Sequence, residues 1–228
     1  MLIKVIIVSI VGGIVCLDRI IVQAMISRPI VAGPITGCTL GDPLTGLVVG
    51  AYIELLWINR YPIGKYVPPN DSLVAILIVA GSVIAGSAMG GVSRELIALA
   101  MLLYIPVGII GQRIDIFIFA SNDALSQKAM EAAKAGDIRT VSLQHSFGIL
   151  KTFCSVTGMI AVLLPLGIYL LRWLFPVVPG NILKALSWVY FFVPVVGVAV
   201  ALTTIKLRGA IPVFSGIVLI VLLVRGIL

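Results

Sequence analysis

The sequence predicts an all-α, polytopic integral membrane protein, and composition and hydropathy are the main reasons. Hydrophobic residues make up 61% of the 228 residues and charged residues only 11%, whereas soluble domains are about 45–50% apolar. The mean hydropathy is +1.21. This composition argues against a soluble protein and leaves no room for a soluble catalytic domain. We therefore predict a single membrane domain over residues 1–228.

Apolar stretches recur along the whole chain and mark the elements that we expect to be helices. Some reach the roughly 17–25 residues that a spanning helix needs, and others are too short to cross a bilayer alone. The first stretch lacks a small-x-small cleavage pattern and is followed by others, so we expect a retained helix rather than a signal peptide. The stretches are 2–17, 30–41, 44–58, 72–88, 96–118, 147–171, 184–205 and 210–224.

The charges lie where topology signals are expected. The net charge is +7, and the basic residues lie mostly between apolar stretches, which predicts contact with membrane lipid and argues against a nucleic-acid partner. The longest polar segment, residues 119–146, has helical composition over 121–135. The positive-inside rule makes this segment a cytoplasmic loop. With its flanks it contains Arg113, Lys128, Lys134, Arg139 and Lys151.

Residues 28–71 predict a broken-helix or re-entrant element. At 1.5 Å per residue, the stretches 30–41 and 44–58 would be helices of about 18 Å and about 22 Å, and neither crosses a hydrocarbon core of about 30 Å. Asp42 suits a helix N-cap and Pro43 the first helical position, so the second helix should start there. A single kinked and tilted helix is the alternative.

Glu54 is a carboxylate in the middle of an apolar stretch, and the glycine spacing places it. Glu54 continues the face formed by Gly46 and Gly50, so we expect its side chain to point toward protein. An ionisable group at membrane depth is a functional-site hypothesis; a buried structural carboxylate is the alternative. Glycines at this four-residue interval, which lets helices approach closely in lipid, are Gly33, Gly37 and Gly41, Gly46 and Gly50, and Gly86 and Gly90.

The sequence contains no enzyme or cofactor motif that we recognise. A single histidine excludes a histidine-pair zinc motif, and no nucleophile elbow, phosphate-binding loop or dinucleotide fingerprint occurs. We therefore predict a chain that is not itself an enzyme and that holds no metal or cofactor.

The polar groups around the broken element suit a polyhydroxylated neutral ligand. Sugar hydroxyls need both donors and acceptors, while sugar C–H faces pack on aromatic rings such as those of Tyr61 and Tyr66. These tyrosines have an alternative role as interfacial anchors, and Asn70 or Asp71 as the cap of a helix that begins near Ser72. The predicted substrate-binding residues are Glu54, Asn70, Asp71, Lys65 and Gln23.

Several ordered motifs resemble the IIC membrane subunit of the mannose/fructose/sorbose family of phosphotransferase-system (PTS) sugar permeases. The likeness is strong over about residues 10–80, moderate to 150 and vague beyond. The motifs are Ser27-Arg28-Pro29, Gly41-Asp42-Pro43-Leu44-Thr45-Gly46, Gly50 to Glu54, Pro62-Ile63-Gly64, Val67-Pro68-Pro69-Asn70, and Gly136-Asp137-Ile138 leading to Ser142-Leu143-Gln144-His145.

This resemblance implies a sugar-translocating subunit in the bacterial inner membrane. It implies a hetero-oligomer with a IID membrane subunit, and a hexose phosphorylated by a cytoplasmic IIB protein that IIA recharges. The phosphoryl carriers lie on those partners, so His145 should not carry phosphate. The family's sugar contacts point to Glu54 and Asn70, then Lys65 and Gln23. A transport-inactive regulatory or scaffold subunit, or an unrelated small-solute transporter, remains the alternative.

Overall fold

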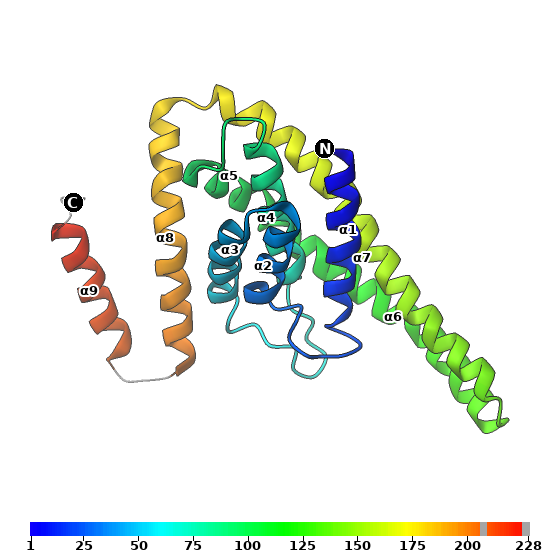
Figure 1. The fold of residues 1–228 in the computed structure, drawn as a ribbon. Coiled ribbons are helices and arrows are strands. Elements are labelled where there is room, and N and C mark those ends of the chain that lie inside the picture. The colour runs from blue at the N-terminus through cyan, green and yellow to red at the C-terminus, as the bar shows by residue number, and fades with distance from the viewer. Residues whose placement is uncertain (206–208, 225–228) are drawn as a thin grey trace.

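The computed structural model describes residues 1–205 and 209–224, and every regular element in this part of the chain is helical (Figure 1). This confirms the predicted all-α membrane fold. Three helical stretches in the described part are long and apolar enough to cross a bilayer, Arg94–Lys134, Ile138–Val177 and Gly180–Thr204. The elements are α1 (Leu2–Leu17), α2 (Pro29–Leu40), α3 (Pro43–Leu56), α4 (Asp71–Gly86), α5 (Arg94–Tyr104), α6 (Val107–Lys134), α7 (Ile138–Leu174), the 3-10 turn η1 (Phe175–Val177), α8 (Gly180–Ile205) and α9 (Ala210–Val224).

Helix α4 forms the centre of the bundle. Every residue from Ser72 to Gly86 is buried, and α1, α2, α3, α5 and α7 pack around it (Figure 1). A helix that is apolar on all faces is buried on all faces, which explains the run of Leu, Val, Ile and Ala in this segment. Its N-terminal end, where Asn70 is the cap residue, therefore has a fixed position.

The predicted break between residues 30–41 and 44–58 is confirmed. Helices α2 and α3 form a tight hairpin of 12 and 14 residues, and a single kinked helix is excluded. The chain leaves α2 through Gly41, whose φ of 87° is left-handed. The Asp42 carboxylate then accepts a hydrogen bond from the Thr45 N–H at 3.0 Å, and Pro43 begins α3.

Four glycines of this hairpin, Gly33, Gly37, Gly46 and Gly50, pack helix α2 against helix α3. Gly33 and Gly37 of α2 face α3, so a β-carbon on Gly33 would lie 3.0 Å from the Gly50 Cα. The prediction for Gly90 was wrong. Helix α4 ends at Gly86, and Gly90 lies in the following turn with a φ of 89° and open space around it.

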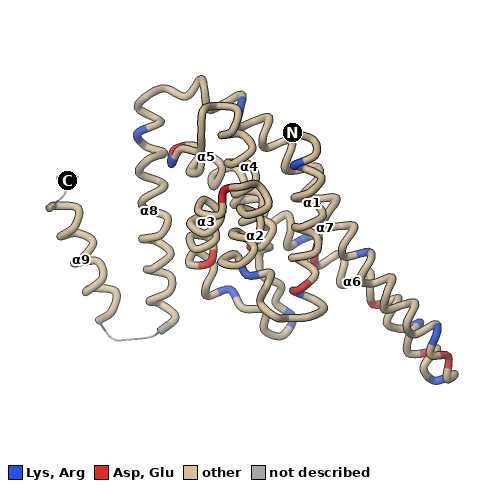
Figure 2. Tube along the Cα trace, in the orientation of Figure 1, with Lys and Arg blue, Asp and Glu red and all other residues tan. Residues whose placement is uncertain are grey.

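The polar segment 119–146 is not a loop but part of a long helical hairpin. Helices α6 and α7 continue through it and meet at a turn over residues 135–137, where Asp137 caps α7 by accepting from the Thr140 N–H at 3.1 Å. The hydrogen bonds from Thr140 hold the pKa of Asp137 below its ordinary value. The hairpin projects from the bundle, and charges gather toward its tip (Figure 2).

The stretch 96–118, expected as one helix, is divided. Helix α5 ends at Tyr104 and α6 begins at Val107, with Ile105 and Pro106 between them. Proline disfavours helical geometry in the residue before it and removes an N–H donor. The break directs α6 past the N-terminal end of α4, where the Gly108 carbonyl accepts from the Asn70 N–H at 2.9 Å.

Candidate functional site

A cavity of about 490 Å³ opens beside the N-terminal end of α4. It lies between the end of α1, the loop that joins α3 to α4, and the facing sides of α6 and α7. We call it the polar cavity, because hydrogen-bonding side chains come from each of these elements. They are Arg19, Lys65, Tyr66, Asn70, Asp115 and Thr152.

Asn70 is the best-fixed polar side chain of the cavity and is 2% exposed. Its Oδ1 accepts from the Leu73 N–H at 3.0 Å and caps α4, as one of the sequence alternatives predicted. Its Nδ2 donates to the Asp115 Oδ2 at 2.9 Å. Gly111 allows this approach, since a β-carbon there would lie 2.8 Å from the Asn70 Cβ.

Asp115 of α6 contributes a carboxylate to the same cavity, and Asp115 is 9% exposed. Its position in an apolar stretch is the same signal that drew attention to Glu54, and the sequence prediction did not include it. Among the described residues, Asn70 alone donates a hydrogen bond to this carboxylate. Its other oxygen is therefore available to accept a ligand hydroxyl.

Arg19 places a guanidinium at the edge of the polar cavity. Its Nη1 lies 3.2 Å from the Asp71 Oδ1, and the two side chains are 23% and 21% exposed. Its Nη2 donates to the Pro69 carbonyl at 3.5 Å. Asp71 therefore positions Arg19 and does not itself line the cavity.

Asp18 fixes the chain between α1 and α2. Its carboxylate accepts from the Ala24 N–H at 2.8 Å and from the Ser27 N–H at 3.0 Å. Burial acts to raise the pKa of Asp18, but these hydrogen bonds outweigh burial and hold the pKa below its ordinary value. Gln23 lies within this segment, is exposed, has a φ of 55°, and does not line the polar cavity.

The loop between α3 and α4 carries Lys65 and Tyr66 over the cavity. Gln112 of α6 donates to the Val67 carbonyl, and the Arg60 Nη1 donates to the Tyr66 hydroxyl at 3.3 Å. Lys65 is exposed at the mouth of the cavity. The loop thus adds one cationic donor and one aromatic ring.

Glu54 points toward protein, as predicted, but it does not line the polar cavity. Its carboxylate pairs with Arg28, the N-cap residue of α2, and its Oε2 accepts from the Ile30 N–H at 3.3 Å. A carboxylate at a helix N-terminus satisfies otherwise unpaired N–H groups. The structure therefore brings together Asn70 and Lys65, adds Arg19 and Asp115, and places Glu54 in the α2–α3 hairpin.

Because Glu54 contacts Arg28 and the Ile30 N–H, we expect Glu54→Gln to lower the stability of the α2–α3 hairpin and to leave the affinity for sugar nearly unchanged. Hydrogen bonds to charged groups contribute about 1.5–3 kcal/mol, and partial exposure of the pair reduces this. We expect a lower melting temperature in detergent and a nearly unchanged affinity for sugar by calorimetry. A tenfold to hundredfold loss of affinity in a stable Glu54→Gln variant would instead support Glu54 as a sugar ligand, on the order expected for one charged hydrogen bond.

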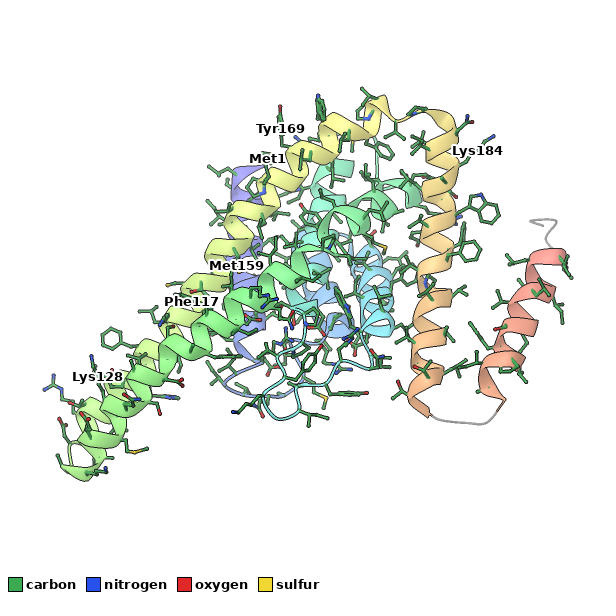
Figure 3. All side chains as sticks on the ribbon, turned by 180° about the vertical axis from the view of Figure 1, so that it is seen from behind. Met1, Phe117, Lys128, Met159, Tyr169 and Lys184 are labelled. Atoms are coloured by element: carbon green, nitrogen blue, oxygen red, sulfur yellow. The ribbon has the colours of Figure 1, made fainter. Side chains whose placement is uncertain are left out.

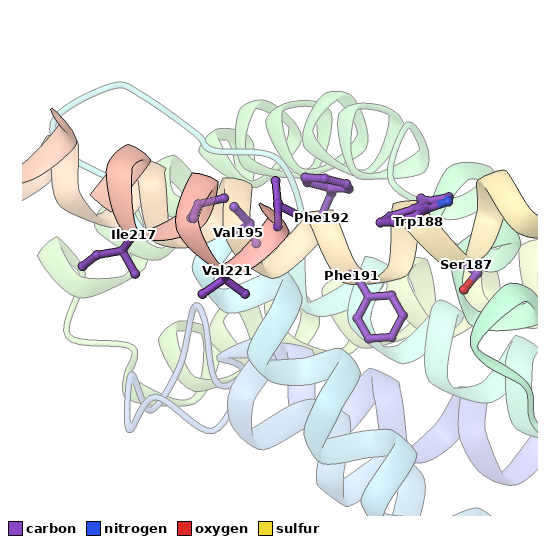
Figure 4. A pocket seen from close by; sticks show the side chains of 9 residues that line it. Ser187, Trp188, Phe191, Phe192, Val195, Ile217 and Val221 are labelled. Carbon is purple, nitrogen blue, oxygen red and sulfur yellow. The ribbon is translucent and has the colours of Figure 1, made fainter. Parts of the chain in front are cut away.

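A second cavity, of about 480 Å³, lies between α8 and α9 and has a different character. Figure 4 shows its side chains, and Trp188, Phe191, Phe192 and Val195 account for much of the α8 wall. Ser187 supplies the one hydroxyl side chain among the nine lining residues. Sugars need several convergent polar groups, so this cavity is a poor candidate for a sugar site.

The chain matches a known family over nearly all of its length. Residues 2–225 match the family described as the PTS system sorbose-specific IIC component. The mannose-specific EIIC component of Escherichia coli K12 is 25% identical over 212 residues, covering 92% of this chain and 77% of the relative. The sorbose-specific EIIC component of Klebsiella pneumoniae is 25% identical over 189 residues, covering 82% and 68%.

Solved structures show the same fold. A chain described as a membrane protein superposes with a TM-score of 0.73 at 23% identity, covering 98% of this chain and 92% of that one. A chain of the mannose transporter ManYZ in complex with microcin E492 gives a TM-score of 0.64 at 22% identity, covering 96% and 86%. Because the family match spans residues 2–225, the chain belongs to the sorbose-specific IIC family of PTS components, which are membrane transport subunits.

Proposed function

We propose that this chain passes a hexose across the bacterial inner membrane and that the polar cavity is the hexose-binding site. The observation that carries this proposal is the Asn70–Asp115 pair, an amide and a carboxylate held 2.9 Å apart beside a cavity of about 490 Å³. Burying polar groups in this way inside an apolar bundle costs free energy unless they form hydrogen bonds with a ligand or with each other.

The chemistry of the lining suits a neutral polyol. The free oxygen of Asp115 accepts a hydrogen bond from a sugar hydroxyl, and Arg19 and Lys65 donate hydrogen bonds to sugar hydroxyl oxygens. Tyr66 and Phe119 also line the cavity, and their rings offer apolar faces for sugar C–H groups. The sequence predicted both Lys65 and Asp71 as ligands. In this proposal Lys65 is a hydrogen-bond donor at the mouth of the cavity, and Asp71 positions Arg19 through their ion pair.

The partners that fit this proposal are a IID membrane subunit, a cytoplasmic IIB protein that phosphorylates the hexose, and a IIA protein that recharges IIB. This chain then needs no phosphoryl carrier, metal or cofactor of its own.

We place the tip of the α6–α7 hairpin on the cytoplasmic side because of its basic residues. A single cysteine at Ser126, in a chain lacking its three native cysteines, should then resist impermeant thiol reagents added outside cells.

Reconstitution tests the proposal. The test sugars are those named for similar proteins, mannose, sorbose, fructose and N-acetylgalactosamine. We expect liposomes that contain the chain with its IID subunit, and phosphorylated IIB inside, to accumulate at least one of these sugars as its phosphate. Omitting IID or IIB should abolish accumulation. Robust uptake by the chain alone would identify a self-sufficient transporter. Stable assembly with IID but no binding or uptake of any of these sugars would favour the regulatory or scaffold role.

A further inference from the structure

A third cavity adjoins the polar cavity along the α6–α7 hairpin. Its volume is about 530 Å³, and we call it the hairpin cavity. Ile20 and Thr152 line both cavities, so the two spaces meet at these side chains. Thr152 is 3% exposed, and its hydroxyl donates to the Gly148 carbonyl at 3.0 Å. The Thr152 hydroxyl oxygen can still accept a further hydrogen bond.

The hairpin cavity carries hydrogen-bonding groups on both walls. Asn122 and Ser126 come from α6, and Gln144 and His145 come from α7. The Asn122 Oδ1 is buried and has no hydrogen-bond partner among the described residues. A buried acceptor without a partner costs folding free energy. The Asn122 carbonyl oxygen can therefore accept a hydrogen bond from a ligand hydroxyl in this cavity.

The position of this cavity relates it to transport. Asn122 and Ser126 lie on α6 between Phe117 and Lys128, which Figure 3 labels along the projecting hairpin. The cavity thus lies between the polar cavity and the charged tip of the hairpin. Gln144 and His145 belong to a motif that the resemblance singled out but that the sugar site does not use.

We infer that the hairpin cavity is the second chamber of the hexose route. A hexose that leaves Asn70 and Asp115 passes Thr152, binds through its hydroxyls to Asn122 and Gln144, and is released near the hairpin tip. This inference rests on the proposed function. Its physical basis is that a polyol leaving the apolar bundle needs replacement hydrogen bonds along its route. The polar cavity and the hairpin cavity share the lining residues Ile20 and Thr152.

A removable plug in the hairpin cavity tests the inference. In a chain lacking Cys16, Cys38 and Cys154, in complex with IID, Gln144→Cys is labelled with a bulky methanethiosulfonate reagent. The unlabelled Gln144→Cys complex should take up its sugar more slowly than the parent complex, because one hydrogen-bond partner of the route is gone, and labelling should abolish the uptake that remains. Calorimetric affinity for that sugar should stay unchanged, because the polar cavity is untouched, and a reductant should restore uptake to the level of the unlabelled variant. Leu143→Cys is the matched control, because Leu143 is the neighbouring residue, is 48% exposed and does not line the cavity.

Normal uptake by the labelled Gln144→Cys complex would overturn the route. Failure of the reagent to reach Gln144→Cys in the assembled complex would also overturn it, because a partner chain would then fill the cavity. A parent complex that neither binds nor carries any of the four sugars would overturn the proposed function, and the inference with it.

A second variant separates transport from structure. Asn122→Leu removes the unpartnered buried acceptor, so we expect the melting temperature to stay the same or rise. We also expect uptake to slow while affinity at the polar cavity is unchanged. A structural role for Asn122 predicts the opposite, a lower melting temperature. Unchanged uptake by the Asn122→Leu complex would remove Asn122 from the route.

Discussion

Replacing Gly46 with alanine is expected to disrupt the α2–α3 hairpin. A β-carbon on Gly46 would overlap the Gly33 carbonyl oxygen and lie 2.9 Å from its carbon. The obstructing atoms are backbone, so they cannot move aside as a flexible side chain would. Overpacking typically costs about 1–3 kcal/mol, and we expect a loss in this range or a failure to fold.

The matched control is Gly158→Ala, a helical glycine of α7 with nothing within 4 Å of its added β-carbon. Alanine is favoured over glycine in a helix by roughly 0.5–1 kcal/mol, so this variant should be as stable as the parent or slightly more so. Both variants gain the same helix propensity, and a difference between them reports the clash alone. Thermal melting in detergent and size-exclusion profiles measure it. Equal stability of the two variants would contradict the packing of α2 on α3.

The α2–α3 hairpin was predictable from sequence because its signals are local. Asp42 and Pro43 mark a helix start within two residues, and the glycines at four-residue spacing mark the faces that meet. The same spacing gave a wrong prediction at Gly90. Spacing alone does not distinguish a glycine in a turn from one that packs between helices unless the end of the helix is known. Pro106 is also a local signal for a helix break, but the continuous apolar run over residues 96–118 favoured a single helix in the sequence prediction.

The candidate site was only partly predictable, because its central contact joins residues far apart in the chain. Asn70 and Asp115 are 45 positions apart, and nothing local to either residue specifies the other. Glu54 shows the converse. Its direction followed from helix periodicity, but its partner, Arg28, depends on how α2 folds back on α3. Local patterns predict which way a side chain points, whereas tertiary packing determines what it meets.

Asn70→Asp is expected to reduce hexose affinity about tenfold to hundredfold, the effect of losing a hydrogen bond to a charged group. The new carboxylate can still accept from the Leu73 N–H and cap α4. When ionised it cannot donate to Asp115, however, and it places a second carboxylate where the amide nitrogen lay 2.9 Å from the Asp115 Oδ2. Like charges at this separation repel, so the geometry of the polar cavity should be lost while the helix cap is kept.

Two companion variants make this prediction specific. Asn59→Asp makes the same chemical change at an exposed position of the same loop that does not line the cavity, so its affinity should equal that of the parent. The double variant Asn70→Asp with Asp115→Asn reverses the pair and restores one amide and one carboxylate. Residues in direct contact give non-additive effects in such a cycle, so the double variant should recover part of the affinity lost by Asn70→Asp. Calorimetric titration of the IID-containing complex measures these variants together with the single variant Asp115→Asn, which completes the cycle. Strictly additive losses would mean that Asn70 and Asp115 do not act together on the hexose.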